Sequence, residues 1–399
     1  MIQPRVRIFV ATLAFCTLQG VTSGADTIVS GIVFDDRNGD GVRQTGENGI
    51  ANVAVSNQID VVATGADGSY RLNSRGTGVV FVSVPRGKAA LTGFWKAVPA
   101  SDAASIDFAL APTADPDDFT FVHASDTHIH EESLPRMKAF LGLLDSRKPS
   151  FAVVTGDLIR DALRVDEGTA ARLYDLYVRE VKTSTTPIWS DPGNHENFGI
   201  ERHHSLVAKT HPLFGKGMYR KYLGPNYYSF NRGRIHFVAL DTVDIEDLWY
   251  YGHVDKAQLD WLAKDLAILP KGTTVVTFNH IPFLSSRTSA SGYTDTGTAP
   301  SLIRVNDRMQ YRHIVSNATD VFRALKDYNF ALSLSGHNHA FERLLLSPLP
   351  GATRFHLAAA VIGPTNDVVP SPSGVTLYRV RGDVIDEGEF VAIDPAAVR

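Results

Sequence analysis

Five short apolar runs in this chain each stop at a turn that carries oxygen or imidazole side chains. In the clearest case, Pro187-Ile188-Trp189 leads into the turn Pro192-Gly193, which presents Asn194 and His195 side by side. The other four runs are Phe119–Ala124 before Asp126 and His128, Phe151–Val154 before Asp157, Thr274–Phe278 before His280, and Ala331–Leu334 before His337 and His339. Ligands of open α/β sheets bind beyond the carboxyl ends of strands, so these stops should converge in one cleft.

The first 25 residues are typical of a secretory signal. Arg5 and Arg7 form a positive start, Ile8–Leu18 an apolar run, and Ser23-Gly24-Ala25 a small-residue cleavage site. The apolar run is too short for a transmembrane helix, and no other stretch of the sequence is long enough to span a bilayer. We therefore expect a secreted or periplasmic protein. Lipid attachment at Cys16 is the alternative, but the preceding Phe fits such a signal poorly.

Composition excludes several other classes of protein. The 399 residues are 44% hydrophobic and 21% charged, as in ordinary globular proteins. The net charge is −4 and there is no long basic run, so no nucleic-acid-binding patch is evident. Cys16 is the only cysteine, and cleavage of the leader would remove it. The mature chain would then have neither disulfides nor a thiol nucleophile.

Residues 26–112 have the short strands and frequent turns of a small β-sandwich. The expected strands are Thr27–Phe34, Val53–Ser56, Val61–Thr64, Ser69–Leu72, Val79–Val84 and Ile106–Leu110. Residues 113–118 are rich in Pro and Asp, which indicates a linker. From residue 119 to 399, strands alternate with helical patterns, which predicts an α/β domain.

A calcium-loop pattern lies within the first of these regions. Its ligand positions hold Asp36, Asn38, Asp40, Val42 (through its carbonyl) and Glu47, with Gly at the sixth position. Strand patterns flank it, so it is not an EF-hand. With Ala66-Asp67-Gly68-Ser69-Tyr70, the region resembles the calcium-binding immunoglobulin-like repeats of bacterial surface proteins. A structural calcium ion is the expectation, and an acidic Asn-Gly-rich turn is the alternative.

The α/β region has clear local patterns. Leu134–Arg147, Thr169–Thr183 and Asp255–Leu269 are expected helices, and Asn226–Asp241 should form two strands with a turn at Arg232-Gly233. The tail should add strands at Phe355–Val361, Gly374–Val380 and Glu387–Ile393, completing the second sheet. Residues 284–318 are a Ser-, Thr- and Gly-rich insertion. Its Arg304, Arg308 and Arg312 have the spacing of one helical face, either solvated or clamping a substrate phosphate.

The residues at the strand ends form one set of metal ligands. Its seven members are Asp126, His128, Asp157, Asn194, His280, His337 and His339. A single histidine after a strand is more often structural. Seven N and O ligands in this context can hold two divalent ions if one carboxylate bridges them. The ligand types allow Mn, Fe, Zn or Co.

The series Asp126-x-His128, Gly156-Asp157, Gly193-Asn194-His195-Glu196, His280 and Gly336-His337-x-His339 resembles the calcineurin-like metallophosphoesterases over about residues 119–365. The family fold is an α/β sandwich of two β-sheets flanked by helices. The resemblance implies that Asp126, His128, Asp157 and His339 bind a first metal. It implies that Asp157, Asn194, His280 and His337 bind a second, with Asp157 as the bridge.

The resemblance also implies a mechanism. A hydroxide held between the two metals attacks phosphorus in line with the leaving oxygen. His195 does not bind metal in the family, and we expect it to protonate the leaving group or stabilise the transition state. Glu196 is expected to orient the turn. Purple acid phosphatases are similar, but carry a Tyr ligand where this chain has Arg160 and lack the first His ligand, His128. The purple subclass is therefore disfavoured.

The sequence predicts a secreted phosphoric ester hydrolase that acts on a small-molecule or polymer substrate. Phosphodiesterase and phosphatase activities both stay open, as do the oligomeric state and the roles of the β-sandwich and the insertion. The alternative from another class is a surface binding or adhesion protein whose large domain is a catalytically idle scaffold. The complete ligand set favours the enzyme.

Overall fold

The computed structural model describes residues 27–100, 103–296, 300–349, 351–363 and 372–393. The expected signal segment and Cys16 lie outside these residues. None of the described helices is long and apolar enough to cross a membrane.

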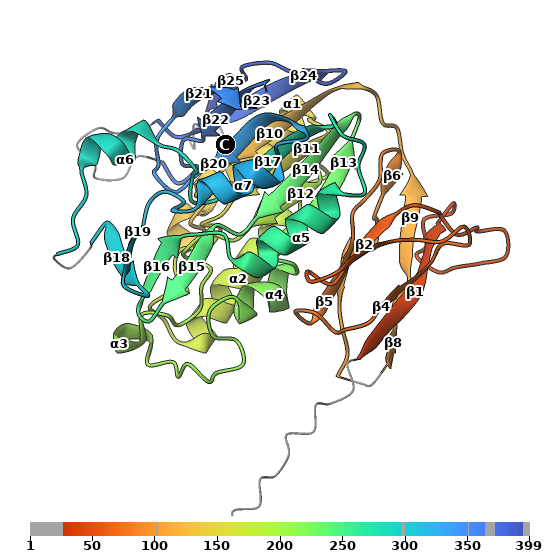
Figure 1. Cartoon of the computed structure of the whole chain (residues 1–399), viewed down its shortest axis with the longest axis horizontal. Helices are drawn as coiled ribbons and strands as arrows, with labels where there is room; N and C mark the ends of the chain where they lie inside the picture. Colours follow the sequence, from red (N-terminus) through yellow and green to blue (C-terminus); the bar gives the residue numbers. More distant parts are fainter. Residues whose placement is uncertain (1–26, 101–102, 297–299, 350, 364–371, 394–399) are drawn as a thin grey trace, which may run out of the picture.

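The described N-terminal residues form β-strands joined by turns, at the right of Figure 1. All six expected strands are present within a few residues, and β6, β7 and β8 are additional. One sheet has the order β4-β1-β9-β6, with β8 also paired to β1, and the other has the order β3-β2-β5-β7. The bounds are β1 Ile28–Asp35, β2 Ala54–Ser56, β3 Val61–Ala63, β4 Ser69–Leu72, β5 Val79–Val82, β6 Lys88–Ala89, β7 Trp95–Ala97, β8 Ala103–Ser105 and β9 Phe108–Pro112.

Two six-stranded sheets form the larger part. The first has the order β12-β11-β10-β23-β24, with β25 paired to β23, and the second has the order β13-β14-β17-β20-β22-β21. The first contains β10 Asp118–Ala124, β11 Phe151–Thr155, β12 Ile188–Asp191, β23 Gly374–Arg381, β24 Val384–Ile385 and β25 Glu389–Ala392. The second contains β13 Tyr228–Arg232, β14 Ile235–Leu240, β17 Thr274–Asn279, β20 Asn329–Ser335, β21 Glu342–Leu349 and β22 Gly351–Leu357.

An aromatic layer joins the two sheets. Phe121 of β10 meets Phe237 of β14 edge-on at 5.6 Å between ring centroids, and Phe151 meets Phe230 in the same way at 5.3 Å. Successive strand residues point to opposite faces, so Val122 and Val154 face outward, against the helices α1 and α2. Helices α5 and α7 cover the second sheet. The fold is thus the expected sandwich of two sheets flanked by helices.

Local sequence signals account for several of the helices. The expected Leu134–Arg147 is α1, and Asp166 and Asp255 are the N-caps of α2 and α5. The helices are η1 Glu131–Ser133, α1 Leu134–Arg147, α2 Glu167–Val181, α3 Arg202–Ser205, α4 Gly217–Leu223, α5 Lys256–Leu266, α6 Ser286–Ser291 and α7 Ala318–Ala324. Two hairpins complete the fold, β15 Val243–Glu246 with β16 Trp249–Gly252, and β18 Leu302–Val305 with β19 Arg308–Tyr311.

The N-terminal strands share a core with the larger part. Phe81 of β5 lies 6.3 Å from Trp261 of α5 and 6.4 Å from Tyr228 of β13, measured between ring centroids. The buried Gln58 donates from Nε2 to the Tyr227 carbonyl at 2.9 Å, and the Tyr227 hydroxyl donates to the Gln58 carbonyl at 2.7 Å. The polar bonds and apolar contacts across this junction fix the N-terminal strands against the sandwich.

Two expectations for the chain were wrong. The tail does not complete only the second sheet, because β23 pairs antiparallel with β10 in the first sheet. Its Val375 and Val380 face the two different cores on either side of that sheet. The second error concerns Arg304, Arg308 and Arg312.

These three arginines do not share a helical face. Arg304 and Arg308 lie in the hairpin β18–β19, at the left edge of Figure 1. Asn306 and Asp307 have φ of 45° and 62°, the left-handed geometry of a tight hairpin turn, which outweighs the four-residue spacing. Arg312 is buried rather than solvated, with its guanidinium 4.3 Å from the centre of the Tyr250 ring.

The expected calcium loop is closed by hydrogen bonds from its own backbone. The Asp36 carboxylate accepts from the N–H groups of Gly39 and Gly41 at 2.8 and 3.0 Å. The Glu47 carboxylate accepts from those of Arg37 and Gln44 at 3.0 and 2.9 Å. Among the described residues, the groups of His, Asp and Glu atoms close enough to hold an ion do not include this loop. Calcium at Asp36, Asn38, Asp40, Val42 and Glu47 stays a prediction.

Candidate metal centre

The seven expected ligands lie at the carboxyl ends of five strands, as the sequence predicted. They are Asp126 and His128 after β10, Asp157 after β11, Asn194 after β12, His280 after β17, and His337 and His339 after β20. Strands β10, β11 and β12 are parallel, and so are β17 and β20. Their carboxyl ends therefore meet at the same edge of each sheet, and the two edges face one cleft.

The backbone at these residues is unusual. Asp126, His128, Asp157, His337 and His339 all have positive φ, between 39° and 69°. Non-glycine residues seldom adopt this conformation, and it costs free energy that the surrounding fold must offset. Gly156, at φ 70°, shows how tight the packing is, because a Cβ there would meet the His280 ring at 2.5 Å. Such strain clusters at functional sites.

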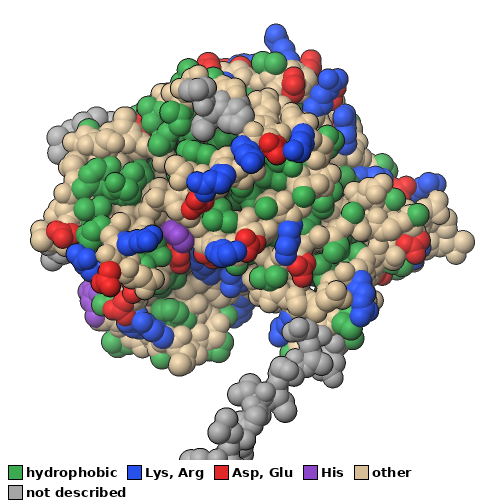
Figure 2. Space-filling model, viewed as in Figure 1, with side chains coloured by type: hydrophobic (Ala, Val, Ile, Leu, Met, Phe, Trp, Pro, Cys, Tyr) green, Lys and Arg blue, Asp and Glu red, His purple; other side chains and the backbone are tan. Residues whose placement is uncertain are grey.

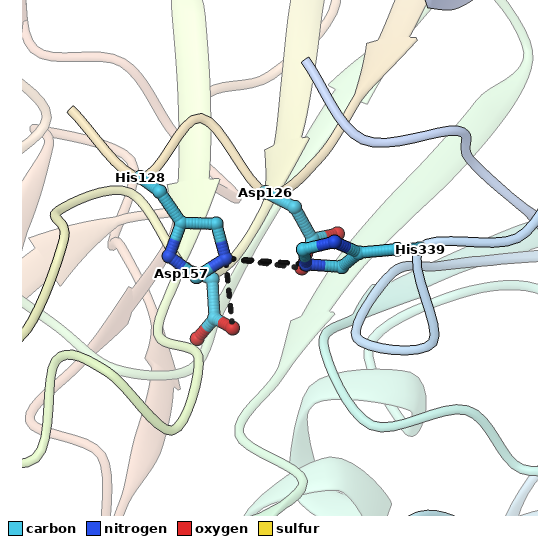
Figure 3. A group of neighbouring side chains, drawn as sticks. All are labelled: Asp126, His128, Asp157 and His339. Atoms are coloured by element: carbon cyan, nitrogen blue, oxygen red, sulfur yellow. Dashed lines mark hydrogen bonds and ion pairs between the residues drawn. The ribbon is translucent and has the colours of Figure 1, made fainter. Parts of the chain in front are cut away.

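The first group of ligand atoms is Asp126, His128, Asp157 and His339, all within 4.8 Å of one another. Figure 3 shows the four side chains pointing toward one another. His128 Nε2 lies 3.2 Å from His339 Nε2 and 3.5 Å from Asp157 Oδ2. His339 Nε2 lies 3.1 Å from Asp126 Oδ1.

The second group surrounds His280 Nε2. This atom lies 3.2 Å from Asp157 Oδ1, 3.1 Å from Asn194 Oδ1 and 3.2 Å from His337 Nδ1. The two Asp157 oxygens thus face different groups, Oδ2 the first and Oδ1 the second. His280 Nδ1 lies 2.8 Å from the Thr155 carbonyl, so Nδ1 keeps its ring proton and Nε2 would be the atom that binds a cation.

The spacing of these atoms fits metal ions. Nitrogen and oxygen ligands about 2.1 Å from an ion lie roughly 3.0–3.4 Å from one another in octahedral or tetrahedral geometry. Five of the measured distances, 3.1–3.2 Å, fall in that range. His128 Nε2 lies somewhat farther from Asp157 Oδ2 and Asp126 Oδ1, at 3.5 and 3.8 Å. A third group, Glu201, His203 and His204, is a poorer candidate. Both of its histidines are exposed and Arg164 already holds the Glu201 carboxylate, at 2.7 Å.

The charges of the buried ligand side chains also favour the binding of cations at this site. Burial raises the pKa values of Asp126 and Asp157, but the neighbouring histidines outweigh it and hold both pKa values below the ordinary range. Burial lowers the pKa of His280, but the Asp157 and Asp126 carboxylates raise it to about 10. Two ionised carboxylates deep in the protein need positive charge beside them. Protonated His280 supplies part of it without metal, and a pair of divalent ions would take the place of that proton.

Glu196 holds two of the ligand turns together. Its buried carboxylate accepts from the backbone N–H groups of Asp157, Leu158 and Ile159 at 2.9, 2.8 and 3.0 Å, and of Gly193 at 2.6 Å. Burial and the Asp157 charge raise the pKa of Glu196, and the hydrogen bonds from these donors oppose that effect. This side chain orients the turn, as the sequence suggested.

His195 stands at the wall of the cleft. Its Nδ1 lies 2.5 Å from the Arg160 carbonyl, which fixes the proton on Nδ1 and turns Nε2 toward the ligands, 3.9 Å from Asp157 Oδ2. The ring meets His128 edge-on at 4.6 Å. The cleft has a volume of about 870 Å³, and Arg160 and Arg287 also line it.

Sequence reasoning missed some residues of this cleft. His130 lies in the wall, with Nδ1 2.8 Å from the His128 carbonyl. Tyr250 of β16 and His313, near the end of the insertion, also line it. His130 could have been predicted as a cleft residue, because it follows the expected ligand His128 by two positions. Nothing in the local sequence distinguished His313 or Tyr250, because the fold brings them in from distant segments.

Two family models match the chain. "Calcineurin-like phosphoesterase" matches residues 119–341, and "N terminal of Calcineurin-like phosphoesterase" matches residues 37–113. The chain belongs to the calcineurin-like phosphoesterase family. The family is one of metal-dependent phosphoesterases, and membership of it disfavours the idle scaffold.

Individual relatives are distant. The chain is 29% identical over 171 residues to purple acid phosphatase 15 of Arabidopsis thaliana, which covers 40% of this chain and 26% of the relative. The chain therefore matches only about a quarter of that protein's length. A dimetal phosphatase from Danio rerio superposes on 69% of this chain and 99% of its own, with 15% identity and a TM-score of 0.42. GAP50, the anchor in the inner membrane complex of Plasmodium, covers 69% and 85%, with 14% identity and a TM-score of 0.42.

Proposed function

We propose that this phosphoesterase is an exported hydrolase of phosphoric esters with two divalent metal ions. Asp126, His128, Asp157 and His339 would hold the first ion. Asp157, Asn194, His280 and His337 would hold the second, with Asp157 shared. The observation that supports this proposal most directly is the arrangement of Asp157, whose two oxygens face the two ligand groups.

The ions would acidify water for attack on phosphorus and neutralise charge on the phosphoryl oxygens. The chain's own residues then have separate tasks. The side chains of Arg160 and Arg287, in the cleft wall, favour an anionic substrate there. His195 receives its orientation from the Arg160 carbonyl. In its imidazolium form it can donate the Nε2 proton to the leaving oxygen, which makes the leaving group a neutral alcohol.

The substrate class has two candidates, a phosphate monoester and a phosphodiester. The cleft volume of about 870 Å³ is large enough for either. On the face shown in Figure 2, acidic and basic side chains are interspersed, which is unlike the broad basic patch of a nucleic-acid-binding surface. The leader sequence supports export, and the loop at Asp36–Glu47 supports a structural calcium ion in the N-terminal part.

The test begins with the metal content of the purified protein and its hydrolysis of p-nitrophenyl phosphate and bis-p-nitrophenyl phosphate. We expect two transition-metal ions per chain and turnover of one ester. Preference for the diester would indicate a phosphodiesterase, and preference for the monoester a phosphatase. A wild-type protein that binds fewer than two transition-metal ions would refute the proposal.

Two variants separate metal binding from proton transfer. Asp157→Asn should lose metal and activity together, because it weakens the ligand that both ions share. His195→Ala should keep both metals and lose about 10²–10⁴-fold in turnover, the usual contribution of a general acid. His211→Ala, which removes a histidine outside the cleft lining, is the matched control. Full turnover in His195→Ala would remove its assignment as the acid.

A further inference from the structure

The insertion at residues 284–318 reaches the candidate metal centre through one side chain. His313, between β19 and α7, places its Nδ1 2.8 Å from Nε2 of the expected ligand His337. The two rings stack, with centroids 5.0 Å apart and planes 25° from parallel. His313 also lines the cleft.

Several contacts hold His313 in this position. The preceding residue, Arg312, is buried and its guanidinium lies over the rings of Tyr250 and Trp249, at 4.3 and 4.9 Å from their centres. The Arg312 N–H donates to the Ser301 carbonyl at 2.9 Å. After His313, the Val315 N–H donates to the Pro282 carbonyl at 2.9 Å. Since both flanks are anchored, the position of the His313 ring is set by the fold.

Tyr250 packs against both histidine rings. Its ring meets His337 edge-on at 5.8 Å and His313 edge-on at 6.4 Å. The hairpin β15–β16, the insertion and the turn after β20 thus meet around the His337 ring. These three segments are far apart in the sequence, and the only polar group that they offer to His337 Nε2 in the described structure is His313 Nδ1.

The protons in this pair can be assigned from the geometry. His337 Nδ1 faces His280 Nε2 at 3.2 Å, in the second ligand group, and must be unprotonated to bind an ion. A neutral His337 therefore carries its proton on Nε2 and donates it to His313 Nδ1. His313 in turn carries its own proton on Nε2. This hydrogen bond keeps the His337 proton on the nitrogen that faces away from the metal site. The Thr155 carbonyl has the same effect on His280.

We propose that His313 is a positioning residue that fixes the tautomer and orientation of His337 and so tightens the second metal site. The insertion is then a structural part of the metal centre rather than only a wall of the cleft. This inference rests on the proposed function, because it needs His337 to be a ligand. Partners that orient a ligating histidine in this way typically contribute about 10–100-fold in metal affinity.

Two substitutions of nearly equal size test the hydrogen bond. In His313→Asn, the amide oxygen takes about the place of Nδ1 and can still accept from His337. In His313→Leu, no acceptor remains. Mn²⁺ is titrated by calorimetry into each metal-free protein, and the two dissociation constants are compared with those of the wild type and of His211→Leu, a substitution outside the cleft lining.

We expect His313→Leu to weaken one of the two sites about 10–100-fold and to leave the other unchanged. His313→Asn should stay within a few-fold of the wild type. Should the leucine variant fail to fold, His313→Ala repeats the test without an acceptor. Wild-type affinities in the Leu variant, or equal weakening in the Leu and Asn variants, would overturn the inference and leave the proposed function intact. A wild-type protein that binds fewer than two ions would instead overturn the proposed function, and this inference with it.

Discussion

Glu196→Gln is the substitution that most directly tests how the ligand turns are held. The wild-type carboxylate accepts four backbone N–H groups, two on each oxygen. A glutamine has the same shape, but one of its two terminal atoms is an NH₂ group. Two of the backbone N–H groups would then point at this NH₂ group and lose their buried acceptor. The turns that carry Asp157 and Asn194 would lose part of their common anchor.

The magnitude follows from these contacts. A hydrogen bond to a charged group contributes about 1.5–3 kcal/mol, and a buried N–H left without an acceptor costs about 1–3 kcal/mol. With two bonds lost and the other two made to a neutral oxygen, we expect a loss of about 3–6 kcal/mol. That is a large part of the roughly 5–15 kcal/mol by which a folded domain is stable.

The assay is urea unfolding in the presence of a chelator, because bound metal would add its own stabilisation. Glu387→Gln is the matched control, since its side chain is 68% exposed and its ion pair with Arg354 should contribute at most about 1 kcal/mol. In a metal titration of the chelator-free protein, Glu196→Gln should also bind both ions more weakly, because the two turns are less well ordered.

A stability within about 1 kcal/mol of the wild type would refute this reasoning. It would mean that burial and the Asp157 charge keep Glu196 protonated in the folded protein at neutral pH. We expect the ionised form, because all four groups around the carboxylate are donors and a proton on either oxygen would find no acceptor.

Two further predictions concern stability away from the cleft. Burial raises the pKa of Asp244, but the hydrogen bond from His253 and the charge of Lys216 lower it to about 2. Because this value is below the unfolded pKa of about 3.9, Asp244 stabilises the fold above pH 4, and the effect is lost as the pH falls toward 2. Asp244→Asn should lose about 1–2 kcal/mol at pH 7 and less at pH 3 by urea unfolding, and an equal loss at both would contradict the argument. Gln58→Ala leaves the Tyr227 carbonyl without its donor and should cost about 1–3 kcal/mol in one cooperative transition. Two separate transitions would show that the N-terminal strands unfold independently.

The sequence alone determined the type of fold and the position of the candidate metal ligands along the chain. Apolar runs of strand length, each stopped by a turn with Asp, Asn or His, are local features set by neighbouring residues. They predicted the strand ends at β10, β11, β12, β17 and β20, and the structure brings their side chains into one cleft. Helix α1 and the strand β4 match the expected bounds because their periodicity and flanking turns are also local.

Only the tertiary structure decided the contacts between distant segments. The pairing of β23 with β10 depends on which sheet edge is available. The residues of β23 do not by themselves indicate this partner. The four-residue spacing of Arg304 and Arg308 was overruled by a tight turn between them. His313 reaches His337 across 24 residues. Pairings of this kind leave no periodic signal in the sequence, because they depend on the packing of whole elements rather than on neighbours in the chain.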